Sequence, residues 1–438
     1  MHFFVILHAQ RYSMNINEAT WEYVRRHRAD DVRKLALQGS HNPDVDLTLA
    51  LQQIAGYQTA RRKLPSWADT EGIIYPPHLN MEQCSSEQTA RYKAGVAARL
   101  RVMITAGEGK DARRQESDGI FVDLTGGFGI DFYWMSHGFA ERHYVEQDEA
   151  LCAIAEQNFR TLGLSCSVSR SCASHFLISM KGRASTVYLD PARRNEYGGR
   201  TFGIADCTPN VLELLPMLVE KSDVIMLKLS PMLDWRKAVA DLEGTAYVHE
   251  VHIVSVSNDC KELLVVLANA PSDGIRLYCV NDGDVFEVAF NAQTAARQPS
   301  RKLASGQTQE LLGTAVEPTG FLYEPNASVM KAGCFAELEA RYPVRQVAQN
   351  SHLFLSSVEI GDFPGRCFQI QAISSMNKRE VNQKLTSMKS ANISVRNFPM
   401  TVEQLRKKLK LKDGGDVYIF ATTDDKGQHQ LYICRKIS

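Results

Sequence analysis

Short apolar runs and helical stretches alternate between residues 119 and 268. GIFVDL, RHYVEQ, STVYLD and SDVIMLKL predict strands, because apolar residues fill most of their positions. Stretches with apolar residues at helical spacing lie between them, such as EALCAIAEQNFRTLG and PNVLELLPMLVE. Strands that alternate with helices indicate a parallel sheet covered on both faces, so this part of the chain is expected to have an α/β fold.

The segment before residue 119 has a helical pattern. Residues 14–60 and the stretch after EQCSS have apolar residues at helical spacing. KLPSW ends the first stretch, because Pro65 cannot continue a helix, and GIIYPPHLN is expected to be a loop. Ser85 and Ser86 are candidate caps of the second stretch.

The pattern changes again after PSDG at residues 271–274. IRLYCV and DVFEVAF predict a small strand-rich insert. From GFLYEP onward, helical stretches such as ASVMKAGCFAELEARY and VEQLRKKLK alternate with strands such as FQIQAI and VYIFATT. This last segment is expected to have an α+β fold.

Composition sets limits but does not indicate a partner. The 438 residues, 44% of them apolar, are enough for roughly two to four domains. Lys plus Arg and Asp plus Glu number 50 each, so a polyanion could be bound only through a local patch. No run of about 18 apolar residues occurs, and we expect no membrane span. MHFFVILHAQ lacks a basic n-region, and a second Met at Met14 leaves the start of translation open.

The ten cysteines are scattered along the chain. They form no CxxC pair and no Cys/His cluster with the spacing of a zinc site. We therefore expect reduced, mostly buried thiols, no metal and a cytoplasmic protein.

The candidate chemistry begins at FVDLTGGFGID, residues 121–131. Glycines after a first strand let a ligand approach the backbone at the carboxyl edge of the sheet. In a dinucleotide fingerprint the glycines follow the strand directly, whereas here Asp123 precedes them. A carboxylate repels a pyrophosphate but attracts the sulfonium and ammonium groups of S-adenosylmethionine (SAM). The alternative is a turn that binds no ligand.

Two later strand ends also carry acids. The strand HYVEQ ends near Glu146, where an acid can accept both hydroxyls of a ribose, and Asp148 can instead cap the next helix. The strand STVYLD ends at Asp190 and Pro191, near the expected position of the methyl group. Asp190 would hold a target nitrogen or a base edge; the alternative is a plain Asp-Pro turn.

Arg193 and Arg194 follow this turn and could contact phosphate. A solvated pair of arginines is the alternative.

These motifs resemble those of the class I SAM-dependent methyltransferases. DLTGGFG is similar to their motif I, Glu146 to the motif II acid and LDPARR to motif IV. The whole chain also resembles a bacterial family of RNA methyltransferases with a THUMP-like C-terminal domain. The similarity is carried by KLPSW, EQCSSEQTARYK, DLTGGFGID, YLDPARR, YEPNASVMKAG and NFPMTVEQLRKKLKLKDGGDVYIFAT.

The resemblance implies a Rossmann-like sheet of seven strands, one of them antiparallel. It implies an N-terminal helical region at 1–100, a methyltransferase domain at 101–272, a small ferredoxin-like segment at 273–318 and a THUMP-like RNA-binding domain at 319–438. It also implies tRNA or rRNA as the substrate, with SAM as the cofactor.

The resemblance further implies the residues of the site. The cofactor would be bound by Asp123, Thr125, Gly127, Phe128, Gly129 and Glu146, and covered by Gln83, Ser85 and Thr89. Helix capping is the alternative role of Ser85. The catalytic residues would be Asp190, Pro191 and Arg193.

The sequence departs from the family pattern at two places. Ala192 replaces the second Pro of motif IV, and Arg193 stands where an aromatic ring usually stacks on the flipped base. The motif III acid is missing from SCSVSRSCASHF, which leaves adenine to backbone groups or Ser171. DPAR is closer to the DPPR of RNA uracil C5-methyltransferases, but no Cys matches their catalytic motif, although Cys260 lies in SVSNDCKE. The acceptor atom therefore stays open.

The C-terminal segment contains a local basic patch. Residues 376–412 include ten Lys or Arg and two acids. Such a patch supplies sequence-independent affinity for phosphates. The predicted RNA contacts are Arg396, Arg406, Lys407, Lys408, Lys410 and Lys412; a solvated helix face is the alternative.

Three functions are compatible with these features. The first is an RNA base methyltransferase. The second is a small-molecule or protein methyltransferase whose C-terminal domain serves as a lid or in oligomerisation. The third is a non-catalytic RNA-binding protein that retains the fold.

Overall fold

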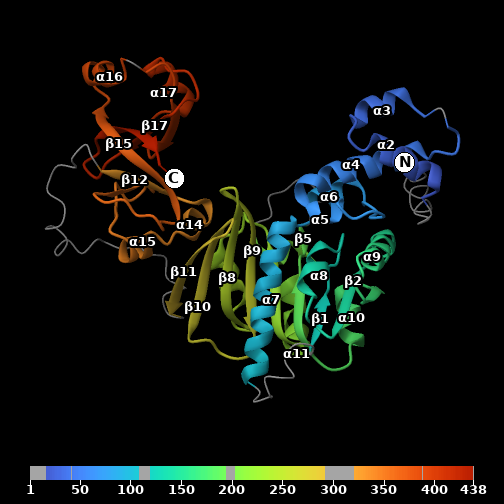
Figure 1. Ribbon diagram of the computed structural model, residues 1–438. Coiled ribbons are helices and arrows are strands. Elements are labelled where there is room, and N and C mark those ends of the chain that lie inside the picture. The colour runs from blue at the N-terminus through green and yellow to red at the C-terminus, as the bar shows by residue number, and fades with distance from the viewer. Residues whose placement is uncertain are drawn as a thin grey trace. The chain divides into compact units, whose positions relative to one another are not determined.

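The computed structural model describes residues 16–40, 42–107, 119–193, 203–291, 320–386 and 388–437 (Figure 1). The apolar opening segment with Met1 and Met14, and also Arg194, lie outside the described residues. The chain divides into two compact units. One is Met1–Val251 with Leu263–Asp273, and the other is His252–Glu262 with Gly274–Ser438.

The first unit begins with the predicted helices. They are α2 (Glu18–His27), α3 (Val32–Gln38), α4 (Leu47–Lys63), α5 (Pro65–Ala68), α6 (His78–Gln83) and α7 (Glu87–Gly107). Asn17, Asp31 and Asp46 cap α2, α3 and α4 through their side-chain oxygens, which accept first-turn N–H groups. Pro65 ends α4 as expected and also occupies the first turn of α5.

The expected loop GIIYPPHLN is only partly a loop. Helix α6 begins at His78, directly after Pro77. Proline cannot donate to a helix from within it, but it is well tolerated where a helix starts. The prediction of a continuous loop here was therefore wrong.

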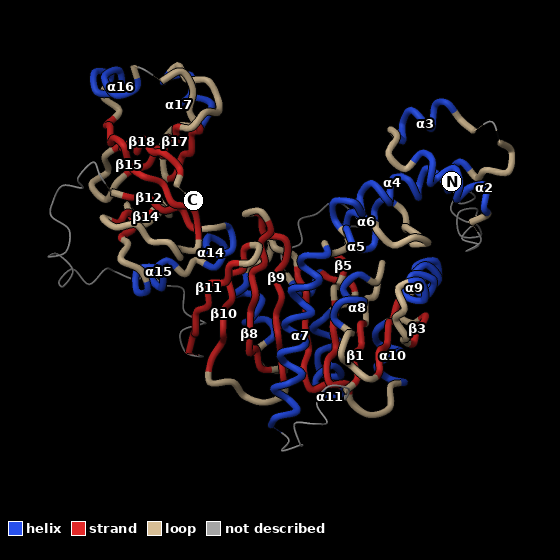
Figure 2. The backbone as a smooth tube through the Cα atoms, in the orientation of Figure 1, coloured by secondary structure: helices blue, strands red, loops and turns tan. Residues whose placement is uncertain are grey.

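A nine-stranded sheet occupies the middle of the chain (Figure 2). Its strands follow the order β11-β10-β8-β9-β7-β4-β1-β2-β3. Their bounds are β1 (Ile120–Asp123), β2 (Glu141–Glu146), β3 (Ser167–Arg170), β4 (Ala184–Leu189), β7 (Ser222–Leu229), β8 (Tyr247–Val256), β9 (Asp259–Ala268), β10 (Gly274–Asn281) and β11 (Asp284–Asn291). Strands β1 to β4 and β7 pair in parallel, and β9 pairs antiparallel with β7.

In the described part of the chain, helices connect the strands of this sheet. They are α8 (Ile130–Met135), α9 (Glu149–Thr161), α10 (Ala173–Ser179), α11 (Val211–Lys221) and α12 (Trp235–Leu242). Asp148 caps α9 as one alternative predicted, since its side chain accepts from Ala150 and Leu151. Residues of α7, α8 and α9 share one apolar core with the strands, including the fully buried Phe121 and Phe132.

A short hairpin follows the strand that ends before Asp190. Strand β5 (Ala192–Arg193) pairs with β6 (Cys207–Thr208), and the 3-10 helix η2 (Ile204–Asp206) leads into β6. The hairpin holds the backbone that follows Pro191.

The second unit contains a seven-stranded sheet in the order β13-β14-β12-β15-β18-β17-β16. The strands are β12 (Phe321–Pro325), β13 (Arg345–Gln346), β14 (Phe354–Ser356), β15 (Gly365–Ser375), β16 (Asn392–Arg396), β17 (Val417–Thr423) and β18 (His429–Lys436). The helices are α14 (Ala327–Ala332), α15 (Phe335–Arg341), α16 (Lys378–Leu385) and α17 (Val402–Leu409). ASVMKAGCFAELEARY forms two helices, because Gly333 adopts a left-handed conformation between them.

The expected fold class is confirmed, and the strand count is larger. The sheet has nine strands where seven were predicted, because the insert after PSDG adds β10 and β11. Within the described residues, none of the helices is both long enough and apolar enough to cross a membrane.

Candidate active site

The parallel strands bring the ends of four segments to one edge of the sheet. Asp123 on β1 is level with Tyr144 on β2 and with Tyr188 on β4. Tyr188 is in turn level with Met226 on β7. In sheets of this kind, ligands bind beyond the carboxyl ends of the strands.

Each of the four segments has a polar side chain two residues after this aligned row of Asp123, Tyr144, Tyr188 and Met226. These polar residues are Thr125, Glu146, Asp190 and Lys228. Residues two apart in a strand point to the same face. The register therefore places three predicted site residues and one unpredicted lysine along one edge.

Asp123 is an almost fully buried carboxyl group, with 1% of its surface exposed. Its Oδ1 accepts a hydrogen bond from the Thr125 N–H at 2.9 Å. Burial raises the pKa of Asp123 well above its usual value, and the nearby carboxylates of Asp131, Asp190 and Glu146 raise it further. Among the described residues, no cation forms an ion pair with Asp123. A cationic ligand is the kind of partner that this carboxyl group would favour.

Glu146 holds the glycine turn. Its Oε2 accepts from the Gly127 N–H at 2.9 Å, and its Oε1 accepts from Gln147 and Asp148 at 2.8 and 2.9 Å. A carboxylate has about four acceptor positions, so these three bonds leave room for about one more. Two ribose hydroxyls would fit only if one backbone bond were given up.

The three glycines of the turn are needed for different reasons. A Cβ on Gly126 would lie 2.2 Å from the Tyr144 ring, and one on Gly129 would lie 2.6 Å from the Phe159 ring. Gly127 has a φ of +54° and a Cβ there would meet little, with Thr125 O at 3.8 Å. Gly126 and Gly129 thus serve packing, whereas Gly127 faces open space and fits a close ligand approach.

Phe128 points away from any open site. Its ring is 3% exposed and packs edge-on against Trp67, with 5.1 Å between ring centroids. Trp67 belongs to KLPSW, so this contact joins α5 to the glycine turn. Only the backbone of Phe128 could face a cofactor.

The three residues predicted to cover the cofactor differ in their surroundings. Gln83 is exposed at the end of α6, while Ser85 and Thr89 are buried. Ser86 caps α7, since its Oγ accepts from the Thr89 N–H at 3.2 Å. Capping by Ser85 was therefore the wrong alternative. Thr89 donates its hydroxyl to the Ser86 carbonyl.

Ser85 instead joins a buried ionic cluster that the sequence did not predict. Its hydroxyl donates to Asp131 Oδ2 at 2.8 Å, and Tyr188 donates to the same oxygen at 2.7 Å. Lys93 is 0% exposed, and its Nζ lies 3.2 Å from Asp131 Oδ1 and 3.0 Å from Ser85 Oγ. Burial alone would raise the pKa of Asp131, but the ammonium groups of Lys93 and Lys228 and the hydrogen bonds hold it below its usual value.

Asp190 is fixed by contacts on both sides. Its N–H donates to Thr125 Oγ1 at 2.6 Å, and its Oδ2 contacts the ammonium of Lys228. Thr125 thus connects the end of β1 to the end of β4. Pro191 is buried, and the backbone of Arg193 lies in β5, while its side chain falls outside what the structure describes.

The region of the missing motif III acid contains no acid in the structure either. Strand β3 ends at Arg170, level with Glu146, and Arg170 pairs with Glu149 at 2.7 Å. The Ser171 N–H donates to the Glu146 carbonyl at 3.0 Å, and its hydroxyl donates to the Cys172 carbonyl. A role for Ser171 in adenine recognition stays a prediction.

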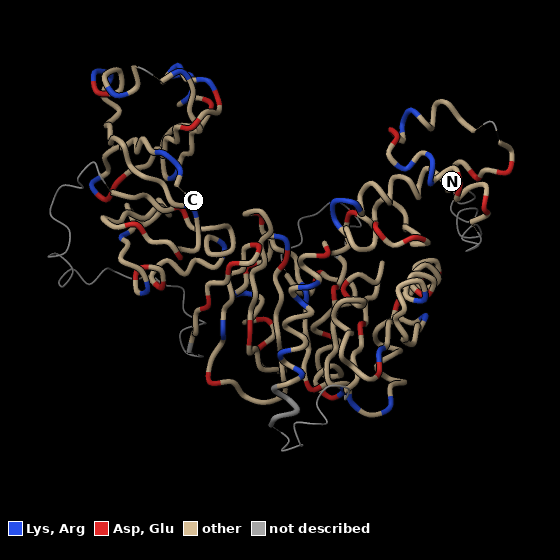
Figure 3. Tube along the Cα trace, in the orientation of Figure 1, with Lys and Arg blue, Asp and Glu red and all other residues tan. Residues whose placement is uncertain are grey.

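The predicted RNA contacts divide into two groups. Arg396 donates to the buried Glu324 at 2.7 Å, and Arg406 donates to Asp413 at 2.6 Å and to the Ala391 carbonyl at 3.0 Å. The lysines are exposed on and after α17, where Figure 3 shows basic positions, and no ion pair between described residues includes them. They are Lys407, Lys408, Lys410 and Lys412.

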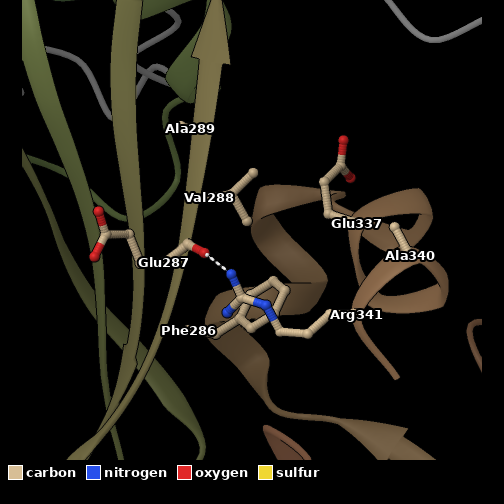
Figure 4. Close-up of a pocket in the computed structure, with 7 residues that line it drawn as sticks. All are labelled: Phe286, Glu287, Val288, Ala289, Glu337, Ala340 and Arg341. Carbon is tan, nitrogen blue, oxygen red and sulfur yellow. Dashed lines mark hydrogen bonds between the residues drawn. The ribbon is translucent and has the colours of Figure 1, made fainter. Parts of the chain in front are cut away.

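The second unit also has a pocket of about 310 Å³ between β11 and α15 (Figure 4). Phe286, Val288 and Ala340 supply apolar wall, and Arg341 crosses it to donate to the Glu287 carbonyl at 2.9 Å. None of the residues predicted to bind cofactor or RNA lines this pocket.

The cysteines show no site chemistry in the described structure. All ten are free, and six of them are buried. Among the described residues, no group of three His, Cys, Asp or Glu side chains could hold a metal.

Lys93, Asp131 and Lys228 are the charged residues that sequence reasoning missed. Asp131 is visible in GGFGID, but nothing near it in the chain indicates its partner. Lys228 could have been noticed in the sequence, because it places a charge within the otherwise apolar end of the strand SDVIMLKL. Lys93 lies in a helix whose pattern gives no sign of full burial.

Comparisons with known proteins agree with this architecture. The chain is similar to the crystal structure of a "putative methyltransferase" from Porphyromonas gingivalis W83. The identity is 26%, the match covers 96% of this chain and 98% of that one, and the TM-score is 0.75. A search of curated proteins finds no relative.

Other solved structures match only part of the chain. An rRNA methylase from Streptococcus thermophilus is 12% identical, covers 41% of this chain and 94% of its own, and has a TM-score of 0.29. A "putative RNA methyltransferase" from Pyrococcus horikoshii is 13% identical over 48% of this chain and 96% of its own, with a TM-score of 0.34. Scores this low support no conclusion about this chain.

Family models match the C-terminal part. A THUMP domain-like model matches residues 365–436, and a ferredoxin-like domain model matches residues 321–364. The ferredoxin-like match lies after the segment 273–318 where the resemblance placed it, in a region expected to belong to the THUMP-like domain.

The fold and the full-length match support a methyltransferase enzyme that uses SAM. Its chain ends in a THUMP-like domain with a sheet of its own.

Proposed function

We propose that this methyltransferase transfers a methyl group from SAM to a base in RNA, such as tRNA or rRNA, in the cytoplasm. The observation that carries the proposal is the register of the sheet. It sets Asp123, Glu146 and Asp190 along one edge, beside the open face of Gly127.

The chain offers matching groups for each part of SAM. Asp123 would stabilise the positively charged end, because a buried carboxyl group gains most from a cationic partner. Gly127, whose peptide is held by Glu146, would let the methionine part lie against the backbone. The remaining acceptor position of Glu146 would bind a ribose hydroxyl.

When bound, SAM supplies a methyl group that its sulfonium already activates, so the protein mainly aligns the reacting groups. Asp190 would accept a hydrogen bond from the acceptor amine of a base flipped out of the RNA. Thr125 fixes the Asp190 backbone at 2.6 Å, which limits the directions from which the acceptor can approach. Pro191 and Arg193 would border the pocket of this base.

The C-terminal domain would supply affinity for RNA. The exposed lysines at and after α17 can each contact a phosphate without competing with an internal ion pair. Arg396 and Arg406 are partly committed to Glu324 and Asp413, so they would contribute less.

Radiolabelled methyl transfer to total RNA tests the proposal. The RNA is taken from cells that lack this protein, so that the target is unmethylated, and the product is digested for nucleoside mass spectrometry. We expect label in RNA and one methylated base, and no label with Asp190→Ala, which removes the acceptor oxygens. SAM binding without RNA labelling would instead indicate a small-molecule or protein substrate.

A further inference from the structure

Lys228 occupies a position that an apolar residue would fill at lower cost. It lies in β7, whose other residues near the site, Met226, Leu227 and Leu229, are buried. Its side chain is 11% exposed. Withdrawing an ammonium group from water is expensive unless an anion compensates, so a charge here needs a specific reason.

The compensating anion is Asp190. The Lys228 ammonium contacts Asp190 Oδ2, and the Asp190 side chain is 35% exposed. One carboxylate oxygen is therefore held from the side of β7, while a third of the Asp190 side chain stays accessible. The Oδ1 atom has no described partner in this network.

The surroundings of this pair are otherwise acidic. Three other carboxyl groups lie at this edge: Asp123 on β1, Glu146 on β2 and Asp131 on α8. Lys93 of α7 is paired with Asp131. The Cys84 thiol lies close enough to Lys228 to interact with its charge. Lys228 is therefore the cation that the Asp190 carboxylate contacts, at an edge where three other carboxyl groups lie.

We propose that Lys228 is a positioning residue for methyl transfer. Its ammonium holds Oδ2, so that Oδ1 faces the acceptor amine as a hydrogen-bond acceptor. Lys228 acts only through Asp190 and exchanges no proton with the acceptor. This inference rests on the proposed role of Asp190 in binding the acceptor.

Lys228→Met and Lys228→Arg in the full chain test the proposal. Initial rates of methyl transfer from labelled SAM to saturating total RNA are measured, and SAM affinity is measured by calorimetry. For Lys228→Met we expect SAM affinity within about threefold of the wild type and a rate at least about 50-fold lower, because the acceptor is no longer aligned. Lys228→Arg keeps a cationic donor to Oδ2 and is expected to rescue the rate to within about threefold of the wild type.

The control is Lys237→Met, which removes an exposed Lys–Asp pair on α12. An Lys228→Met protein that binds SAM and retains the wild-type rate would overturn the proposal. If Lys228→Met does not fold, Lys228→Arg decides, because a folded Lys228→Arg protein that binds SAM but has a rate at least about 50-fold below that of the wild type would also overturn it. A wild-type protein that binds no SAM or labels no RNA would instead refute the proposed function.

Discussion

The carboxyl edge of the nine-stranded sheet and the α17 segment both concentrate charge, but they hold it differently. At the sheet edge, Asp123 is 1% exposed and accepts a hydrogen bond from Thr125, and Lys93 is 0% exposed and pairs with Asp131 of another helix. On and after α17 the lysines are exposed and form no described ion pair. Buried charges fix geometry, whereas exposed charges attract a partner from many directions.

This difference predicts how each region responds to mutation. Removal of one member of a buried pair leaves its partner charged in a poorly solvated site, so a single change has a large effect. Exposed lysines act through screened attraction, so their effects are individually small and depend on salt. The following substitutions test this contrast.

The largest expected effect is on stability. Lys93→Met would leave Asp131 buried without its cation, and we expect a loss of about 3–5 kcal/mol in the free energy of unfolding. Urea denaturation followed by circular dichroism measures it. Lys237→Met, which removes an exposed pair, is the control and should cost less than about 1 kcal/mol. Equal losses in both variants would show that burial of the Lys93 pair does not matter.

The next effect is on cofactor affinity. Asp123→Asn should weaken SAM binding by about 100-fold, or about 2.7 kcal/mol, because the amide cannot stabilise a cation by charge. The control is Asp148→Asn, which keeps an acceptor at the α9 cap. Calorimetry with both variants measures the affinity, and equal affinities would contradict the role of Asp123.

The same variant separates binding from folding. The folded-state pKa of Asp123 is raised, so its contribution to stability is present at low pH and is lost as pH rises through that value. The melting temperature of Asp123→Asn relative to that of the wild type should therefore rise, and not fall, as pH increases. A marked drop would show that the carboxylate serves the fold rather than the ligand.

Lysines of the α17 segment should have smaller, additive effects. Changing Lys407, Lys408, Lys410 and Lys412 to Ala should weaken RNA binding by about 10- to 100-fold at low salt. The slope of log affinity against log salt should fall by about 3, since each phosphate contact on a single strand contributes about 0.7. Filter binding at several salt concentrations measures both.

The control for these changes removes three exposed lysines elsewhere, Lys181, Lys237 and Lys261. It should leave the RNA affinity and its salt slope close to those of the wild type. If the control loses as much affinity as the α17 variant, RNA binding does not depend on the α17 segment.

The smallest effect concerns pH. Because burial raises the pKa of Asp123, its carboxyl group holds a proton at higher pH than an ordinary Asp does, and a cationic ligand would displace that proton. SAM affinity should therefore rise with pH, by at most about tenfold per unit, until Asp123 is fully ionised. Calorimetry in two buffers of different ionisation enthalpy should detect proton release. Uptake of protons on binding, or a SAM affinity that falls as pH rises, would contradict this role of Asp123.

Patterns local in the chain could be predicted from the sequence. Apolar runs gave the strands, and the acids that follow them lie at one edge because parallel strands end together. The Asp148 cap depends on residues two and three positions away, so its pattern is also local. The prediction of a loop over GIIYPPHLN was wrong at its end, where α6 begins. A pair of prolines directly before a helix has the same sequence pattern as a pair of prolines within a loop.

Contacts between distant segments could not be predicted in this way. Lys93 meets Asp131 from another helix, and Arg396 meets Glu324 from another strand. Neither pair has a spacing rule, since only the packing of the fold brings its members together. Ser85 was predicted to cover the cofactor and Arg396 to contact RNA, but in the structure both side chains bond to other residues of the chain.

The most direct test of the central claim is a crystal structure of the protein with S-adenosylhomocysteine. The account predicts the amino-acid end of the ligand against Gly127 and near Asp123, a ribose hydroxyl within hydrogen-bond distance of Glu146, and the sulfur facing Asp190. A ligand bound elsewhere, such as in the pocket between β11 and α15, with the sheet edge empty at saturating concentration, would contradict it.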